Sequence, residues 1–153
     1  MNRDFRDLLS AFNDRGVEYL VVGAHALAAH GHVRATKDLD VWVRPEPDNA
    51  ARVLAALKSF GAPLQELTET DLASPGLIFQ IGVPPVRIDV LTAIDGVEFE
   101  EAWNTRIRAR FADLEAMVIS KEYLIRNKRA AGRLQDLADV ERLEQSASFR
   151  RKA

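Results

Sequence analysis

Three aspartates are the residues whose types and spacing best suit catalytic chemistry in this chain. Asp38 and Asp40 begin the segment 38–43, which alternates polar and apolar residues like a strand with one solvated face. Side chains at positions i and i+2 of a strand point to the same face, so both carboxylates face one place. Asp89 lies between apolar neighbours, as expected on a second strand whose other face is buried. If the two strands are neighbours, three carboxylates converge.

Carboxylates in such a group need a cation. They repel one another and raise one another's pKa unless a positive charge offsets them. Magnesium suits the group because it takes oxygen ligands and is commonly shared between carboxylates and substrate phosphates. We therefore expect Asp38, Asp40 and Asp89 to hold two Mg²⁺ ions, with Mn²⁺ as the alternative metal. Two such ions can clamp the attacking and leaving oxygens in phosphoryl transfer. An Asp-x-Asp pair alone is weak evidence, because solvated pairs at strand ends are common.

Groups that suit a phosphate surround these carboxylates in the sequence. Gly23 separates a buried strand from a helix, and such a turn aims backbone N–H groups and the positive helix end at one point. A simple tight turn would need the same glycine. Arg34, Thr36 and Lys37 carry basic and hydroxyl groups directly before the aspartates, although a solvated loop has the same composition. Arg87 shares the face of Asp89, where it either pairs with a site carboxylate, contacts substrate or forms a structural salt bridge.

The elements that must position these residues alternate along the chain. Hydrophobic periodicity and turn residues predict helices at 3–15, 24–30, 49–60, 97–103, 120–131 and 133–147, and strands at 17–22, 38–43, 76–81 and 86–91. The last two strands form a plausible hairpin through 82–85. Residues 62–75 are expected to be an irregular crossing with a short strand or helical turn, and 106–118 to hold one or two short edge strands. The order indicates an α/β fold with a mixed sheet and helices on one side.

Composition narrows the class of protein. The 153 residues fit one domain, and a formal charge of −2 does not suggest a protein held on nucleic acid by bulk electrostatics. The absence of cysteine excludes disulfides, thiolate catalysis and cysteine-bound zinc. No apolar run approaches the roughly 20 residues that cross a bilayer, and the charged N-terminus lacks a signal core. We expect a cytoplasmic protein without a membrane partner.

The combined pattern resembles a known superfamily. Val21-Val22-Gly23-Ala24-His25-Ala26-Leu27, then Gly31, Arg34-x-Thr36-x-Asp38-Leu39-Asp40 and Arg87-Ile88-Asp89-Val90-Leu91 are similar to the DNA polymerase beta-like nucleotidyltransferases. The resemblance is closer to the small branch containing the AbiEii/AbiGii-type toxin enzymes. The core match covers 17–91, and the segment 120–148 looks like the helical end of that branch.

The resemblance implies a four- or five-stranded mixed sheet flanked by helices, with the active site at its open edge. Asp38 and Asp40 then correspond to the metal-binding pair, and Asp89 to a third carboxylate that helps hold the metal and accepts a proton. The residues implied to contact the nucleotide are Gly23, Ala24, His25, Arg34, Thr36, Lys37, Lys121 and Lys128. Ala24 is a departure, because the family pattern has glycine or serine there. The backbone N–H of Ala24 still serves, and His25 could add a side-chain donor, although a lone histidine is more often structural.

Three functions are compatible with these residues. The first is a magnesium-dependent enzyme that moves a nucleoside monophosphate from an NTP to a tRNA, a protein or a small molecule. It could act as the toxin of a toxin–antitoxin pair, with a cognate antitoxin or a second copy as partner. The second is an inactive nucleotide-binding module, which Ala24 favours. The third is a plain magnesium-binding or interaction domain, which would make the Gly23 turn coincidental.

Overall fold

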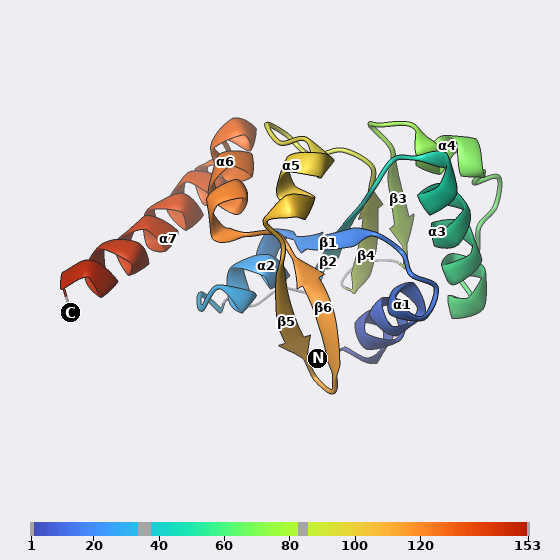
Figure 1. Cartoon of the computed structure of the whole chain (residues 1–153), viewed down its shortest axis with the longest axis horizontal. Helices are drawn as coiled ribbons and strands as arrows, with labels where there is room; N and C mark the ends of the chain where they lie inside the picture. Colours follow the sequence, from blue (N-terminus) through green and yellow to red (C-terminus); the bar gives the residue numbers. More distant parts are fainter. Residues whose placement is uncertain (1, 34–37, 83–85, 153) are drawn as a thin grey trace.

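The computed structural model describes residues 2–33, 38–82 and 86–152 and contains a mixed α/β fold (Figure 1). The helices are α1 (Arg3–Asp14), α2 (Gly23–Ala29), α3 (Pro47–Phe60), α4 (Glu69–Ala73), α5 (Phe99–Asn104), α6 (Lys121–Ala131) and α7 (Leu134–Lys152). The strands are β1 (Tyr19–Val22), β2 (Asp38–Val43), β3 (Ile78–Ile81), β4 (Arg87–Leu91), β5 (Ile107–Phe111) and β6 (Leu114–Val118). The α/β class predicted from the sequence is confirmed.

The six strands form one sheet in the order β3-β4-β2-β1-β6-β5. β2 pairs with β4 in parallel, and β1 pairs with β6 in parallel, whereas the remaining neighbours are antiparallel. The expected four or five strands become six because residues 106–118 form a complete hairpin. Of these two strands, β5 lies at one edge of the sheet, whereas β6 continues the sheet by pairing with β1.

Helices cover both faces of the sheet. Trp42 and Val43 are consecutive residues of β2 and therefore point to opposite faces. On the Trp42 face, the Phe99 ring of α5 packs 4.9 Å from the Trp42 ring. On the other face, where Tyr19 pairs with Val43, Phe12 of α1 packs 5.5 Å from the Tyr19 ring. The prediction that helices lie on one side of the sheet is therefore wrong, because the apolar side chains of β2 need cover on each face.

Local chemistry explains where several elements begin. α3 begins two residues before its predicted start at residue 49, with Pro47 in the first turn, where the missing N–H of proline would have no helical partner. The crossing at 62–75 contains α4, which a capping box between Thr68 and Asp71 begins. α7 runs to Lys152, five residues beyond the predicted end. Among the helices of the described residues, none is long and apolar enough to cross a bilayer.

Candidate active site

The two strands that carry the aspartates are neighbours in the sheet. β2 and β4 pair in parallel with Asp40 opposite Asp89 and Asp38 opposite Arg87. Directly paired residues of neighbouring strands point to the same face, so the three carboxylates and the guanidinium of Arg87 share one face. The structure thus brings together the three aspartates that the sequence singles out.

Arg87 pairs with two of these carboxylates. Its Nε lies 2.9 Å from Oδ1 of Asp89, and its Nη2 lies 3.3 Å from Oδ2 of Asp89 and 3.5 Å from Oδ2 of Asp38. Of the roles that the sequence left open for Arg87, pairing with a site carboxylate is therefore realised. One cation of the protein offsets part of the negative charge of the site.

The negative charge of Asp40 is only partly compensated. Burial, followed by the negative charges of Asp89 and Asp38, raises the pKa of Asp40 from 3.8 to about 6, while the positive charges of Arg87 and Arg133 oppose the rise. A raised pKa of this origin shows that the folded protein disfavours the ionised carboxylate. An additional cation near Asp40 would relieve this effect.

Gly23 is required by its backbone and by its contact with Asp40. Its φ is +68°, a left-handed conformation that side-chain-bearing residues rarely adopt. A Cβ added at Gly23 would also collide with Oδ2 of Asp40. α2 begins at Gly23 without a side-chain cap, directly beside the Asp40 carboxylate. The glycine predicted from the sequence is therefore part of the wall around Asp40.

A pocket of about 430 Å³ opens over Asp40. Its lining residues come from the sheet, from the segment after β4 and from the two C-terminal helices: Val22, Gly23, Asp40, Ile78, Leu91, Ala93, Ile94, Asp95, Asn127, Lys128, Ala131, Arg133 and Asp136. The lining combines apolar side chains with charged groups of both signs. Such a pocket can contact both an apolar ring and a charged group.

Several predicted nucleotide contacts are placed elsewhere or not described. Arg34, Thr36 and Lys37 lie outside the described residues. The His25 ring packs 5.4 Å from Phe5 and 6.4 Å from Phe111, and burial lowers its pKa. Because the ring is enclosed by aromatic side chains of α1 and β5, His25 is not in position to donate to a ligand in the pocket.

The two predicted lysines also differ from expectation. Lys121 is the first residue of α6 and is not among the residues that line the pocket. Lys128 lines it but is 4% exposed, and its Nζ lies 2.9 Å from Oδ2 of Asp139 and 3.6 Å from Oδ1 of Asp136. Lys128 therefore joins α6 to α7 as a buried cation.

Arg133 is a charged pocket residue that the sequence analysis did not assign to the site. It follows Gly132, which ends α6 in a left-handed conformation with φ +70°. Its side chain donates from Nε and Nη2 to the carboxylate of Asp136 at 2.7 and 3.2 Å. The available signal was an arginine just after a helix-ending glycine and three residues before an aspartate. In the sequence alone, that pattern also fits a solvated helix face.

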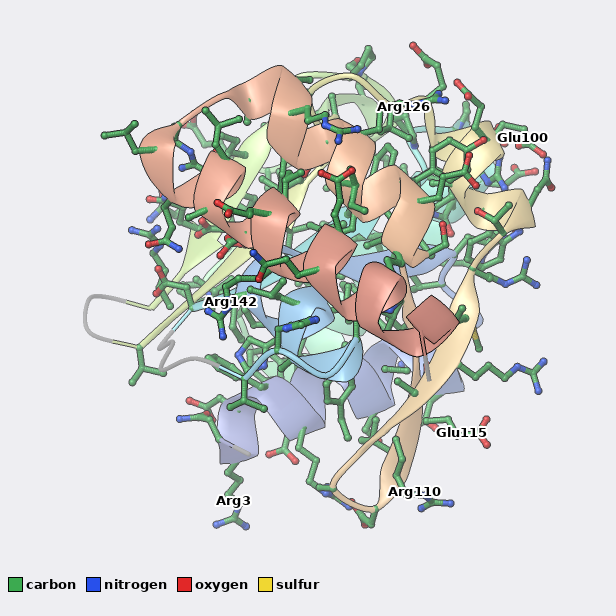
Figure 2. The ribbon with its side chains drawn as sticks, turned by 90° about the vertical axis from the view of Figure 1, so that its left-hand side faces the viewer. Arg3, Glu100, Arg110, Glu115, Arg126 and Arg142 are labelled. Atoms are coloured by element: carbon green, nitrogen blue, oxygen red, sulfur yellow. The ribbon has the colours of Figure 1, made fainter. Side chains whose placement is uncertain are left out.

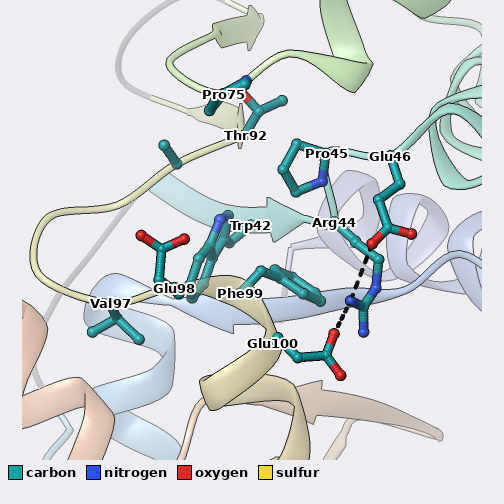
Figure 3. A pocket seen from close by; sticks show the side chains of 11 residues that line it. Trp42, Arg44, Pro45, Glu46, Pro75, Thr92, Val97, Glu98, Phe99 and Glu100 are labelled. Carbon is teal, nitrogen blue, oxygen red and sulfur yellow. Dashed lines mark hydrogen bonds and ion pairs between the residues drawn. The ribbon is translucent and has the colours of Figure 1, made fainter.

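A second pocket, of about 380 Å³, lies on the same face of the sheet and shares Ala93 with the first. Figure 3 shows that Trp42 and Phe99 form part of its wall, with Arg44 held between carboxylates. Arg44 pairs with Glu100, with Glu18 at 2.9 Å and with Glu46 at 3.5 Å, and its guanidinium lies 4.8 Å from the centre of the Phe99 ring. The positive charge of Arg44 is therefore already balanced.

Charges of both signs are spread over the outer surface. In Figure 2, Arg110 and Glu115 lie on the β5–β6 hairpin, where they are paired in register. Arg126 of α6 lies 3.1 Å from Glu101. These pairings fit the small net charge and do not form a basic surface for nucleic acid.

Within 2–33, 38–82 and 86–152, no three acidic or histidine side chains surround one point as a ready metal cage. Arg87 lies between Asp38 and Asp89, so oxygens of these two carboxylates face a guanidinium. Magnesium does not require such a cage, because it is usually bound by one or two carboxylates together with water and substrate phosphates. The oxygen donors of Asp40 and Asp89 therefore still fit this ion.

The fold is that of nucleotidyltransferases. The chain is similar to a candidate nucleotidyltransferase from Thermotoga maritima, with 14% identity and a TM-score of 0.58 over 99% of this chain and 92% of that one. It is also similar to the antibiotic-resistance factor ANT(2'')-Ia, with 16% identity and a TM-score of 0.65 over 97% and 90% of the two chains. The lincomycin-bound lincosamide adenylyltransferase LnuA gives 13% identity and a TM-score of 0.59 over 94% and 96%. No family model and no curated protein matches the sequence. At sequence identities of 13%, 14% and 16%, the similarity to these structures establishes a shared fold alone.

Proposed function

We propose that this protein is a magnesium-dependent nucleotidyltransferase that moves a nucleoside monophosphate from an NTP to an acceptor hydroxyl. The observation that carries the proposal is the pairing of Asp40 with Asp89 on adjacent parallel strands, beside the Gly23 turn and under the pocket. Carboxylates without full compensation next to a pocket suit a cation and a phosphate chain. The shared fold of the nucleotidyltransferases named above supports the same reaction class.

Each residue has a distinct part in this proposal. Asp40 and Asp89, with Asp38 beside them, would hold Mg²⁺, which supplies neutralisation of phosphate charge and orientation for in-line displacement. The acceptor oxygen attacks the α-phosphorus, the bond from that phosphorus to the bridging oxygen breaks, and pyrophosphate leaves. Asp89 takes the proton of the acceptor hydroxyl. Gly23 lies beside Asp40, and the backbone N–H groups of Gly23 and Ala24 would donate to the phosphates.

A small molecule is the acceptor class that the pockets favour. The two pockets of about 430 and 380 Å³ adjoin on one face of the sheet, a size that suits a nucleotide beside a second small ligand. Among the proteins of similar fold, ANT(2'')-Ia has been captured with adenylyl-2''-tobramycin and LnuA with lincomycin. ATP is therefore the first donor to test. The narrower AbiEii/AbiGii assignment, with a toxin role and an antitoxin partner, stays a prediction from the sequence.

A nucleotide-binding module without turnover is the second candidate. The pairing of Arg87 with Asp38 and Asp89 favours it, because a guanidinium there competes with a metal ion for the same oxygens. Ala24 favours it as well, since it lacks the hydroxyl that serine would bring to the phosphates.

Label transfer separates the two candidates. The protein is incubated with Mg²⁺, each labelled NTP and a panel of amino- and hydroxyl-bearing acceptors, with tRNA included. Pyrophosphate release by the wild type that is abolished in the D38N/D40N variant supports the enzyme. Nucleotide-dependent thermal stabilisation without release supports the binding module. Neither stabilisation nor release with any NTP would reject both.

A further inference from the structure

Lys128 is the residue of α6 that the sequence suggests as a contact for the triphosphate. Its side chain is almost fully buried, and its partners Asp136 and Asp139 are 3% and 0% exposed. Gln135 donates to the second oxygen of Asp139 at 3.0 Å. A buried cation shared by two buried carboxylates cannot turn to a ligand without leaving unpaired charges behind. Lys128 is therefore an anchor between α6 and α7.

Arg133 is exposed to solvent, in contrast to the buried Lys128. The Arg133 side chain is 79% exposed, whereas that of Asp136, which holds it, is 4% exposed. The backbone N, Nε and Nη2 of Arg133 all donate to Asp136, which leaves Nη1 without a protein partner among the described residues. The fixed fork of a guanidinium suits phosphate oxygens, and a side chain that is already oriented loses less entropy on binding.

Arg133 lines the same pocket as one of the site carboxylates. Arg133 and Asp40 line the same pocket, the first from the α6–α7 junction and the second from the sheet. A polyphosphate chain held beside Asp40 in this pocket would therefore have the Arg133 cation in the same lining.

We propose that Arg133 binds the β- and γ-phosphates of the nucleotide, and that Asp136 positions it from an anchor made by Lys128 and Asp139. This inference rests on the function proposed above. It places the phosphate-binding cation at the junction of α6 and α7. The buried ion pairs of Lys128 then hold this cation in position through Asp136. The pocket would then select triphosphates over monophosphates through a single exposed side chain.

Binding experiments on the full chain test this assignment. Isothermal titration calorimetry with Mg²⁺ would use three probes: an α,β-methylene analogue of the NTP that stabilises the protein most, the matching NMP, and inorganic tripolyphosphate. We expect R133Q to weaken the analogue and tripolyphosphate by roughly 10- to 100-fold, as expected for lost charge-assisted hydrogen bonds. NMP affinity should stay within about twofold. R133K keeps the charge without the fork, so it should recover only part of the loss.

Matched variants complete the test. R129Q removes another exposed arginine, which pairs with Glu144 at 2.7 Å outside the pocket, and should bind all probes like the wild type. D136N should lower the preference for triphosphate over monophosphate, a ratio that a purely structural defect would not change. Equal loss of NMP and analogue affinity in R133Q, or no loss at all, would overturn the inference while leaving nucleotide binding intact. A wild type that binds none of the three probes would overturn both the inference and the proposed function.

Discussion

Replacing Asp40 with asparagine is expected to stabilise the metal-free protein at neutral and alkaline pH. Burial and the charges of Asp89 and Asp38 raise the pKa of Asp40 from 3.8 to about 6. The folded state therefore holds this proton more tightly than the unfolded state, so stability falls as pH rises from about 4 to about 6 and stays lower above that range. A difference of about 2 pH units corresponds to about 3 kcal/mol, an upper bound because the side chain is only partly buried. We expect a gain of about 1–3 kcal/mol for D40N at pH 8.

Urea unfolding in EDTA at pH 4, 6 and 8 measures this effect, since the midpoint reports the free energy of unfolding at each pH. The advantage of D40N should be largest at pH 8 and nearly absent at pH 4. E66Q, which removes an exposed carboxylate from the loop before α4, should show no such trend. With Mg²⁺ and NTP present, the wild type should gain stability and D40N should not. A D40N variant that is no more stable than the wild type at pH 8, or equally so at every pH, would refute the reasoning.

Three further predictions concern the neighbours of Asp40. R87Q removes the ion pairs of two site carboxylates, so the metal-free protein should lose about 1–3 kcal/mol and regain most of it in millimolar Mg²⁺, as measured by denaturation with and without the metal. G23A should cost more than G16A, because both glycines have φ near +67° but only Gly23 would collide with a neighbour; equal losses in urea would contradict this. K128M should cost about 3–5 kcal/mol because it removes the buried ammonium that two buried aspartates share, whereas R129A should cost at most about 1 kcal/mol, as comparison of their thermal melts would show.

Local sequence rules were sufficient for the carboxylates. The spacing of Asp38 and Asp40 at i and i+2 places both on one strand face whatever the rest of the fold, and the apolar neighbours of Asp89 indicate a strand. The helix predicted at 120–131 and observed as Lys121–Ala131 follows from local signals in the same way. These predictions depend on backbone geometry over a few residues, which is why they needed no knowledge of the tertiary structure.

The predictions for charged side chains on helices were less reliable. Lys128 and Arg133 are both basic residues near the end of one helix, and the sequence analysis chose Lys128 as a nucleotide contact. The structure buries Lys128 between two aspartates and leaves Arg133 exposed over the pocket. Which of two neighbouring cations is buried depends on how α7 packs against α6, a long-range contact that helix periodicity does not encode. The surroundings of His25 depend on long-range packing in the same way, because its aromatic partners lie on α1 and β5.

The sequence by itself determined the α/β class, the elements that carry the site and the three aspartates, because these follow from local periodicity and residue chemistry. Only the tertiary structure decided that β2 and β4 pair in parallel with Asp40 opposite Asp89, and that Arg87 offsets part of their charge. It also decided that β6 joins the sheet beside β1 and that Arg133 lines the same pocket as Asp40. Strand partners and ion pairs are set by the packing of segments far apart in the chain, where one residue of register changes which side chains meet.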